Sequence, residues 1–170
     1  MAKVPGAKPK KATNSMIDLL VDIPLFDRLD GSELKIVVQY VNQIDVKPGE
    51  YVFKEGERGS YMCFVAHGIF DVLKKPMKGA SLAISSLRKG QSIGEVSVID
   101  TYPRSATVRA RTNGALVTLS RDSFQSLIDE HPRIGIKLFQ SISRLLCFHL
   151  RKTSSGFADL LFSLEQEITP

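Results

Sequence analysis

The chain of 170 residues has no tryptophan, two cysteines and no apolar run near the roughly 20 residues that a membrane-spanning helix needs. Cys63 and Cys147 form no Cys-x-x-Cys motif, which argues against a disulfide framework or a zinc site, so we expect both thiols in the core. The N-terminus carries charge without the apolar stretch of a secretory signal. These absences predict a cytoplasmic protein that has no membrane partner.

The residue patterns of common enzyme classes are absent too. The sequence has no nucleophile elbow, Walker loop, His-Glu-x-x-His motif or clustered pair of acidic residues. His67, His131 and His149 are scattered over a predicted strand, a helix end and a helix, which argues against a metal or acid–base role. We therefore expect neither catalysis nor a bound metal.

The formal net charge of +5 divides unevenly along the chain. Residues 1–15 hold Lys3, Lys8, Lys10 and Lys11 and no acidic residue, so this segment contributes +4 and the remainder only +1. A segment of Lys, Pro and Ala cannot bury enough apolar surface to pack, so we expect a basic disordered tail over 1–15. The alternative is an arm that docks on an acidic partner or on nucleic acid. Because the body is nearly neutral, we do not expect nucleic acid as a partner.

Two short helices are predicted before the β section, as a small N-terminal bundle. Asn14 or Ser15 can cap the first helix, whose apolar residues end before Pro24. The second begins near Asp30-Gly31-Ser32. Its expected buried side consists of Leu34, Ile36, Val37, Val38 and Val41.

Between Gln43 and Ser120 the sequence consists of short β-branched or aromatic segments separated by glycine and proline. The predicted strands are Ile44–Val46, Tyr51–Phe53, Cys63–Ala66, Ile69–Leu73, Leu82–Leu87, Ala106–Arg111 and Ala115–Leu119. This pattern is typical of an antiparallel sandwich or barrel and not of βαβ units. We predict an α+β fold: an antiparallel β-roll (double-stranded β-helix or jelly-roll type) over about 43–120, with N-terminal helices and a long C-terminal helix.

After Ser120 helical periodicity returns, which predicts a helical lid and a dimerisation helix over about 121–168 within a folded domain of 16–170. Along this helix one set of residues alternates spacings of three and four: Leu150, Thr153, Phe157, Leu160 and Leu164. Such an alternation is the seam of a coiled coil, so it predicts a homodimer. The alternative is that the stripe packs back on the roll.

The segment 90–110, which reads GQSIGEVSVIDTYPRSATVRA, carries the residues with chemistry. A short helix after Gly94 would expose its first amides to an anion, and Gly94 lets the backbone approach the ligand closely. Arg104 can make a forked, charge-assisted contact to a phosphate. The free amides of Ser105 and Ala106 can close the other side of that phosphate.

Glu95 adds a second requirement to the same segment. An ionised carboxylate only accepts hydrogen bonds, so beside a phosphate it would repel the ligand unless a hydroxyl donor stood between them. A ribose 2′-hydroxyl is such a donor. A phosphate beside a ribose hydroxyl is part of a nucleotide, so the segment predicts a nucleotide site.

At these residues the sequence resembles the cyclic nucleotide-binding domains of the bacterial catabolite activator protein and of the regulatory subunit of cAMP-dependent protein kinase. The resemblance covers roughly residues 20–165. It rests on LFDRL at 25–29, PGEYVFKEGERGSYMCFVAHGIFDV at 48–72 and GEVSVIDTYPRSATVRA at 94–110. The nine-position step from Glu95 to Arg104, followed by Ser105-Ala106, is similar to the kinase-type phosphate-binding cassette.

The resemblance implies a role for each matching residue of the cassette. Glu95 would take the ribose 2′-hydroxyl and Arg104 an exocyclic phosphate oxygen. Amides of the flanking residues would line the phosphate, namely those of Val96 or Ser97 and of Ala106. Ser105 implies cAMP as the preferred ligand and cGMP as a possible one, because activator-like proteins hold Ser there and cGMP-selective relatives often hold Thr.

The C-terminal helix carries a second part of the resemblance. The segment LRKTSSGFADLL from Leu150 is similar to the activator helix that covers the base, which would place Thr153 and Ser154 near the purine. The sequence departs from the family at Ile93, where a Phe is common, and it lacks the activator's DNA-binding domain. We therefore expect a signalling module that acts in trans on an unknown effector protein.

Each of these roles has a simpler alternative. Glu95 can be a carboxylate that complements a helix start, with Arg104 as its partner on the surface. Thr153 and Ser154 can be tolerated polar positions on a helix. The alternative for the whole chain is a dimeric scaffold or interaction protein of the same fold that binds no nucleotide.

Overall fold

The computed structural model describes residues 14–76 and 79–168. The predicted basic tail lies outside these residues except for Asn14 and Ser15, which belong to the first helix. The N-terminal elements are α1 (Asn14–Val21), the 3₁₀ turn η1 (Pro24–Phe26) and α2 (Gly31–Val37).

The second N-terminal helix starts at the predicted place because Asp30 caps it. One carboxylate oxygen of Asp30 accepts from the amides of Ser32 and Glu33, at 2.8 and 2.9 Å, and the Glu33 carboxylate accepts from the Asp30 amide. The prediction that Val41 lies on this helix is wrong. The helix ends at Val37, and Val41 opens the first strand, where it is paired with Leu119.

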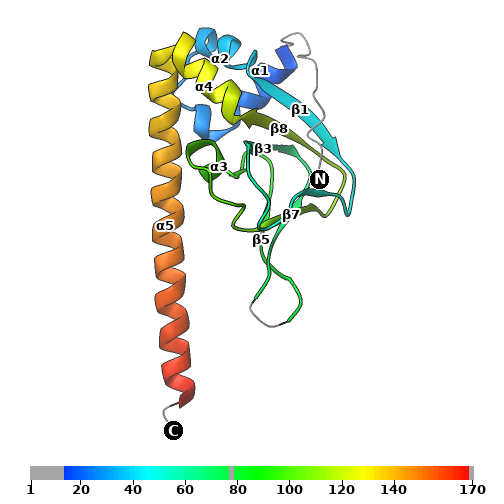
Figure 1. Ribbon diagram of the computed structural model, residues 1–170, viewed down its shortest axis with the longest axis vertical. Coiled ribbons are helices and arrows are strands. Elements are labelled where there is room, and N and C mark those ends of the chain that lie inside the picture. The colour runs from blue at the N-terminus through cyan, green and yellow to red at the C-terminus, as the bar shows by residue number, and fades with distance from the viewer. Residues whose placement is uncertain (1–13, 77–78, 169–170) are drawn as a thin grey trace.

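Within the described residues, eight strands form two antiparallel sheets of four strands each, which confirms the predicted roll. One sheet has the order β1 (Val41–Val46), β8 (Gly114–Ser120), β3 (Tyr61–His67), β6 (Ser92–Ile93). The other has the order β2 (Tyr51–Phe53), β7 (Thr107–Ala110), β4 (Phe70–Lys74), β5 (Leu82–Leu87). Figure 1 shows the sheets below a cap of N-terminal helices.

Strand β3 is buried on both of its faces because it separates two cores. Met62 and Phe64 point to a core shared with the helices, whereas Cys63 and Val65 point to a core between the sheets. Alternation of side chains along a strand produces this division. Burial raises the pKa of the Cys63 thiol to about 12.

Two helices follow the roll, α4 (Arg121–Glu130) and α5 (Pro132–Ile168). The first turns of α5 pack on the helical core through Ile134, Leu138 and Ile142. Further along, the prediction that Cys147 is a core thiol is wrong, because this thiol is exposed on α5. The apolar neighbours of Cys147 in sequence gave no information about which side of the helix it takes.

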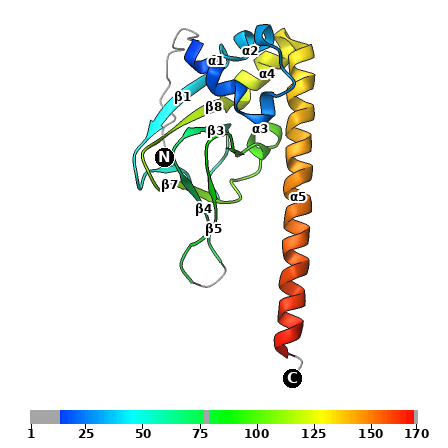
Figure 2. The ribbon, with the colours of Figure 1, turned by 180° about the vertical axis from the view of Figure 1, so that it is seen from behind.

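The distal half of α5 leaves the body of the protein. Figures 1 and 2 view the molecule from opposite sides. Both show the distal half of α5 running along one side of the roll and continuing past it. Every residue from Leu150 to Gln166 is exposed. The alternative that the apolar stripe packs back on the roll is therefore wrong.

Among the helices of residues 14–76 and 79–168, none has both the length and the apolar character to cross a membrane.

Candidate functional site

A cavity of about 1000 Å³ lies between the roll and α5. Its walls come from β5, from the segments around 90–97 and 102–106, and from the side of α5 that faces the roll. Eight of the nine residues predicted for the site line it: Gly94, Glu95, Val96, Ser97, Arg104, Ser105, Ala106 and Thr153. The ninth, Ser154, is exposed on α5 and is not part of this lining.

The start of the short helix α3 (Val96–Ile99) depends on Gly94. Gly94 has φ +84°, and a Cβ there would lie 2.3 Å from Nη1 of Arg104. The Ser97 amide donates to the Gly94 carbonyl at 3.1 Å. Of the two alternatives predicted on this side of the phosphate, the amides of Val96 and Ser97, this leaves the Val96 amide, for which no acceptor is found in the described part of the chain.

Arg104 is a buried cation with 4% of its surface exposed. Its Nη1 donates to Ser97 Oγ at 2.9 Å and its Nη2 to the Tyr61 carbonyl at 2.7 Å, while Nε has no acceptor among the described residues. The guanidinium carbon lies 3.9 Å from the centroid of the Phe53 ring, a cation–π distance. Burial lowers the pKa of Arg104 because it penalises the charged form. These partners are neutral, so an anion would complete the site.

Glu95 stands directly before α3 and has 5% of its surface exposed. Its Oε1 lies 3.0 Å from Nδ1 of His149 on α5. Its Oε2 is buried and has no partner in the described ranges. Glu95 caps no amide of α3, and both it and Arg104 are buried. Arg104 is buried and donates to Ser97 and Tyr61, so the alternative that it is a surface partner of Glu95 is wrong.

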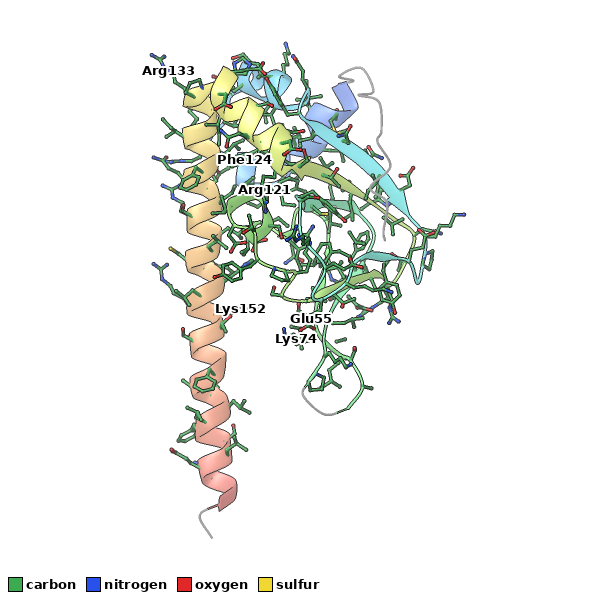
Figure 3. All side chains as sticks on the ribbon, viewed as in Figure 1. Glu55, Lys74, Arg121, Phe124, Arg133 and Lys152 are labelled. Atoms are coloured by element: carbon green, nitrogen blue, oxygen red, sulfur yellow. The ribbon has the colours of Figure 1, made fainter. Side chains whose placement is uncertain are left out.

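Both sides of the cassette are tied to neighbouring elements. Lys74 donates to the Ser105 carbonyl and to Glu55, each at 2.6 Å. Arg121, at the start of α4, donates to the carbonyls of Ser97 and Asp100 beside α3. Figure 3 labels Lys74 and Glu55 on the roll and Arg121 at the start of α4. The peptide groups that would face a phosphate are thus fixed from two directions.

The structure adds residues to the cavity that the sequence did not single out. Lys74 and Lys152, labelled in Figure 3, reach it from the roll and from α5. His149 also lines it, although the sequence assigned it no role. One signal was available: His149 precedes Thr153 by four residues, and such residues share a helix face.

Within the described ranges, no group of three or more His, Cys, Asp or Glu side chains could hold a metal ion.

Comparison with known proteins supports one family. Residues 43–131 match the model of the cyclic nucleotide-binding domain. The chain is 25% identical over 148 residues to a CRP-like cAMP-activated global transcriptional regulator of Mycobacterium tuberculosis, covering 87% of this chain and 64% of that protein. It is 34% identical over 102 residues to a cGMP-dependent protein kinase of Plasmodium berghei, covering 60% of this chain and 11% of the kinase. The chain thus spans less than two thirds of either relative.

The fold is similar to that of solved structures. A cyclic nucleotide-binding domain from Methylobacillus flagellatus superimposes with a TM-score of 0.76 at 25% sequence identity, covering 85% of this chain and 81% of that one. The roll and helices predicted from the sequence therefore have a solved counterpart.

Proposed function

The chain belongs to the cyclic nucleotide-binding domain family, and we propose from this premise that it is a sensor for a 3′,5′-cyclic mononucleotide. One observation carries the proposal. The buried Arg104, whose partners are neutral, and the buried, unpartnered Oε2 of Glu95 belong to the lining of one cavity of about 1000 Å³. A phosphate and a ribose hydroxyl, joined in one ligand, supply an anion for Arg104 and a hydrogen-bond donor for the Glu95 carboxylate.

The proposed roles follow the chemistry of the lining. Arg104 holds the cyclic phosphate, and the amides of Val96 and Ala106 donate to its oxygens. Glu95 accepts from the ribose 2′-hydroxyl. Thr153 on α5 contacts the purine in this proposal, and Ser154 is given no contact because it lies outside the cavity lining.

We further propose cAMP as the preferred ligand. One of the two relatives is a cAMP-activated regulator and the other a cGMP-dependent kinase, which supports the ligand class and not the choice within it. The choice of cAMP over cGMP rests on Ser105, because the resemblance associates a serine at this position with cAMP. The non-enzymatic, regulatory role in the cytoplasm and the action in trans on a separate effector stay predictions.

The homodimer is proposed on the exposure of α5. Four apolar side chains at the seam spacing are 45–68% exposed: Leu150, Phe157, Leu160 and Leu164. A row of this kind, spaced by alternating threes and fours, is buried when two such helices pair. The alternative function is a dimeric scaffold that binds no nucleotide. Both functions use α5 for dimerisation, and they differ only in whether the cavity binds a ligand.

Calorimetric titration of the whole chain separates the two functions. We expect binding of cAMP, weaker binding of cGMP, and no binding of a cyclic dinucleotide. Adenosine serves as a control for the phosphate, because it retains the base and the 2′-hydroxyl but gives Arg104 no anion. If cAMP and cGMP at millimolar concentration give neither heat nor a shift in melting temperature, the sensor function is excluded and the scaffold remains.

A further inference from the structure

His149 lies on α5 and contacts the start of α3, 54 positions earlier in the sequence. The Nδ1–Oε1 distance of 3.0 Å to Glu95 is a hydrogen-bond distance, and both residues line the cavity. We propose that His149 is a further residue of the ligand site, which competes with the ribose 2′-hydroxyl for the Glu95 carboxylate and so sets the selectivity for ribose over 2′-deoxyribose. This inference rests on the proposed function, because it assumes that Glu95 accepts from a nucleotide.

The burial of the carboxylate supports competition. Oε2 of Glu95 is enclosed by protein, and Oε1 is taken by His149. The Glu95 side chain is 7% exposed and that of His149 is 44% exposed, so His149 lies on the more open side of the pair. A hydroxyl that approaches Glu95 from the cavity therefore reaches Oε1, the oxygen that His149 already contacts, and the two donors compete for it.

The exchange of donors has an energetic consequence. In the wild type a ribose hydroxyl gains one hydrogen bond at Glu95 and His149 loses one, so the hydroxyl adds little net affinity. Without His149, the buried carboxylate has no donor from the described part of the protein until the ligand supplies one, and an unpaired buried acceptor is costly. The hydroxyl then adds the full value of a hydrogen bond to a charged group.

A cycle of two proteins and two ligands tests the exchange. The whole chain and its His149→Ala variant are titrated by calorimetry with cAMP and 2′-deoxy-cAMP in the same buffer. We expect the substitution to tighten cAMP about tenfold, the size of one charge-assisted hydrogen bond, and to leave 2′-deoxy-cAMP unchanged. The fold is not at risk, because His149 is partly exposed on a helix and Ala favours helix.

Two further variants control the experiment. His149→Asn retains an N–H donor at the position of Nδ1, so it should restore the wild-type ratio between the two ligands. His67→Ala removes an exposed histidine at the end of β3, outside the cavity lining, and should change neither affinity. Equal ratios in the wild type and in His149→Ala, or weaker cAMP binding by His149→Ala, would overturn the competition. If neither protein binds either nucleotide, the proposed function itself fails.

Discussion

Nη2 of Arg104 donates to the backbone carbonyl of Tyr61 over 2.7 Å, and the charge of the guanidinium meets no carboxylate among the hydrogen bonds of the described residues. A carbonyl satisfies the N–H group but does not neutralise the charge. The aromatic rings of Phe53 and Tyr61, 3.9 and 4.7 Å from the guanidinium carbon, supply only the weaker attraction of a π face. Arg104 is thus a buried cation without a hydrogen-bonded anion among the described residues.

The first prediction concerns this cation. Arg104→Ala should weaken cAMP binding by roughly 2 to 5 kcal/mol, because a buried phosphate would lose its counter-charge. Arg104→Lys should also weaken binding, since an ammonium group lacks the planar fork. Calorimetry measures both.

Arg88→Ala is the matched control, because Arg88 is exposed and outside the cavity lining. Unchanged affinity in Arg104→Ala, with Arg88→Ala also unchanged, would remove Arg104 from the site.

The second prediction compares two glycines with the same backbone conformation. Gly94 has φ +84° and Gly49 has φ +83°, so alanine at either should cost roughly 1–2 kcal/mol of unfolding free energy. Only at position 94 would the new Cβ meet Nη1 of Arg104, whereas position 49 opens on free space. Gly94→Ala should therefore also weaken cAMP binding, and Gly49→Ala should not. Denaturant unfolding and calorimetry give the two quantities, and equal effects of both variants on binding would contradict the assignment.

Much of the fold was predictable because glycine and proline separate the strands. The bounds of Tyr51–Phe53 and Leu82–Leu87 agree with the prediction to the residue. Val41 was assigned to a helix because it continues the helical spacing of Leu34, Val37 and Val38. Its true place depends on pairing with Leu119, and a local pattern contains no information about a partner 78 positions away.

The cassette was predictable for a different reason: its residues are close together in sequence. Glu95 and Arg104 are nine positions apart, and both line the cavity. His149 was missed because its contact with Glu95 depends on the path of α5 across the roll. Ser154 was included by resemblance, and one position along a helix turns a side chain by about 100°.

The third prediction concerns the oligomeric state. In the double variant Leu160→Glu and Leu164→Glu, a helix pair would have to desolvate both new charges. Light scattering should therefore report a monomer for this variant and a dimer for the wild type. The control is the double variant Ser155→Glu and Gln166→Glu, which adds the same charge. Because a helix turns by about 100° per residue, these positions lie on the opposite side of α5, so the dimer should stay intact.

An unchanged mass in the double leucine variant would mean that these leucines form no seam. A wild type that is itself monomeric would exclude the homodimer directly.

The fourth prediction concerns the coupling of the ligand to α5. Saturating cAMP should protect the amides of α5 around Thr153 from hydrogen exchange, because this part of the helix lines the cavity, whereas β1, which has no residue in the cavity lining, should not change. Thr153→Ala should reduce that protection and weaken cAMP binding about fivefold, the size of a neutral hydrogen bond.

Ser155→Ala removes a hydroxyl two positions further along and outside the cavity lining, so it should behave as the wild type. Protection confined to the cassette, with α5 unaffected at saturation, would show that the protein holds its ligand without moving the helix.

The most direct test of the central claim is amide NMR of the labelled whole chain with and without saturating cAMP. If the cavity between the roll and α5 is the cyclic nucleotide site, the largest shifts should fall on the amides of Val96 and Ala106 and on the Nε–H of Arg104. These groups would donate to the phosphate, while the amides of β1 on the far sheet edge should not move. A spectrum that stays unchanged at saturating cAMP, or one whose largest shifts fall outside the cavity lining, would contradict the account.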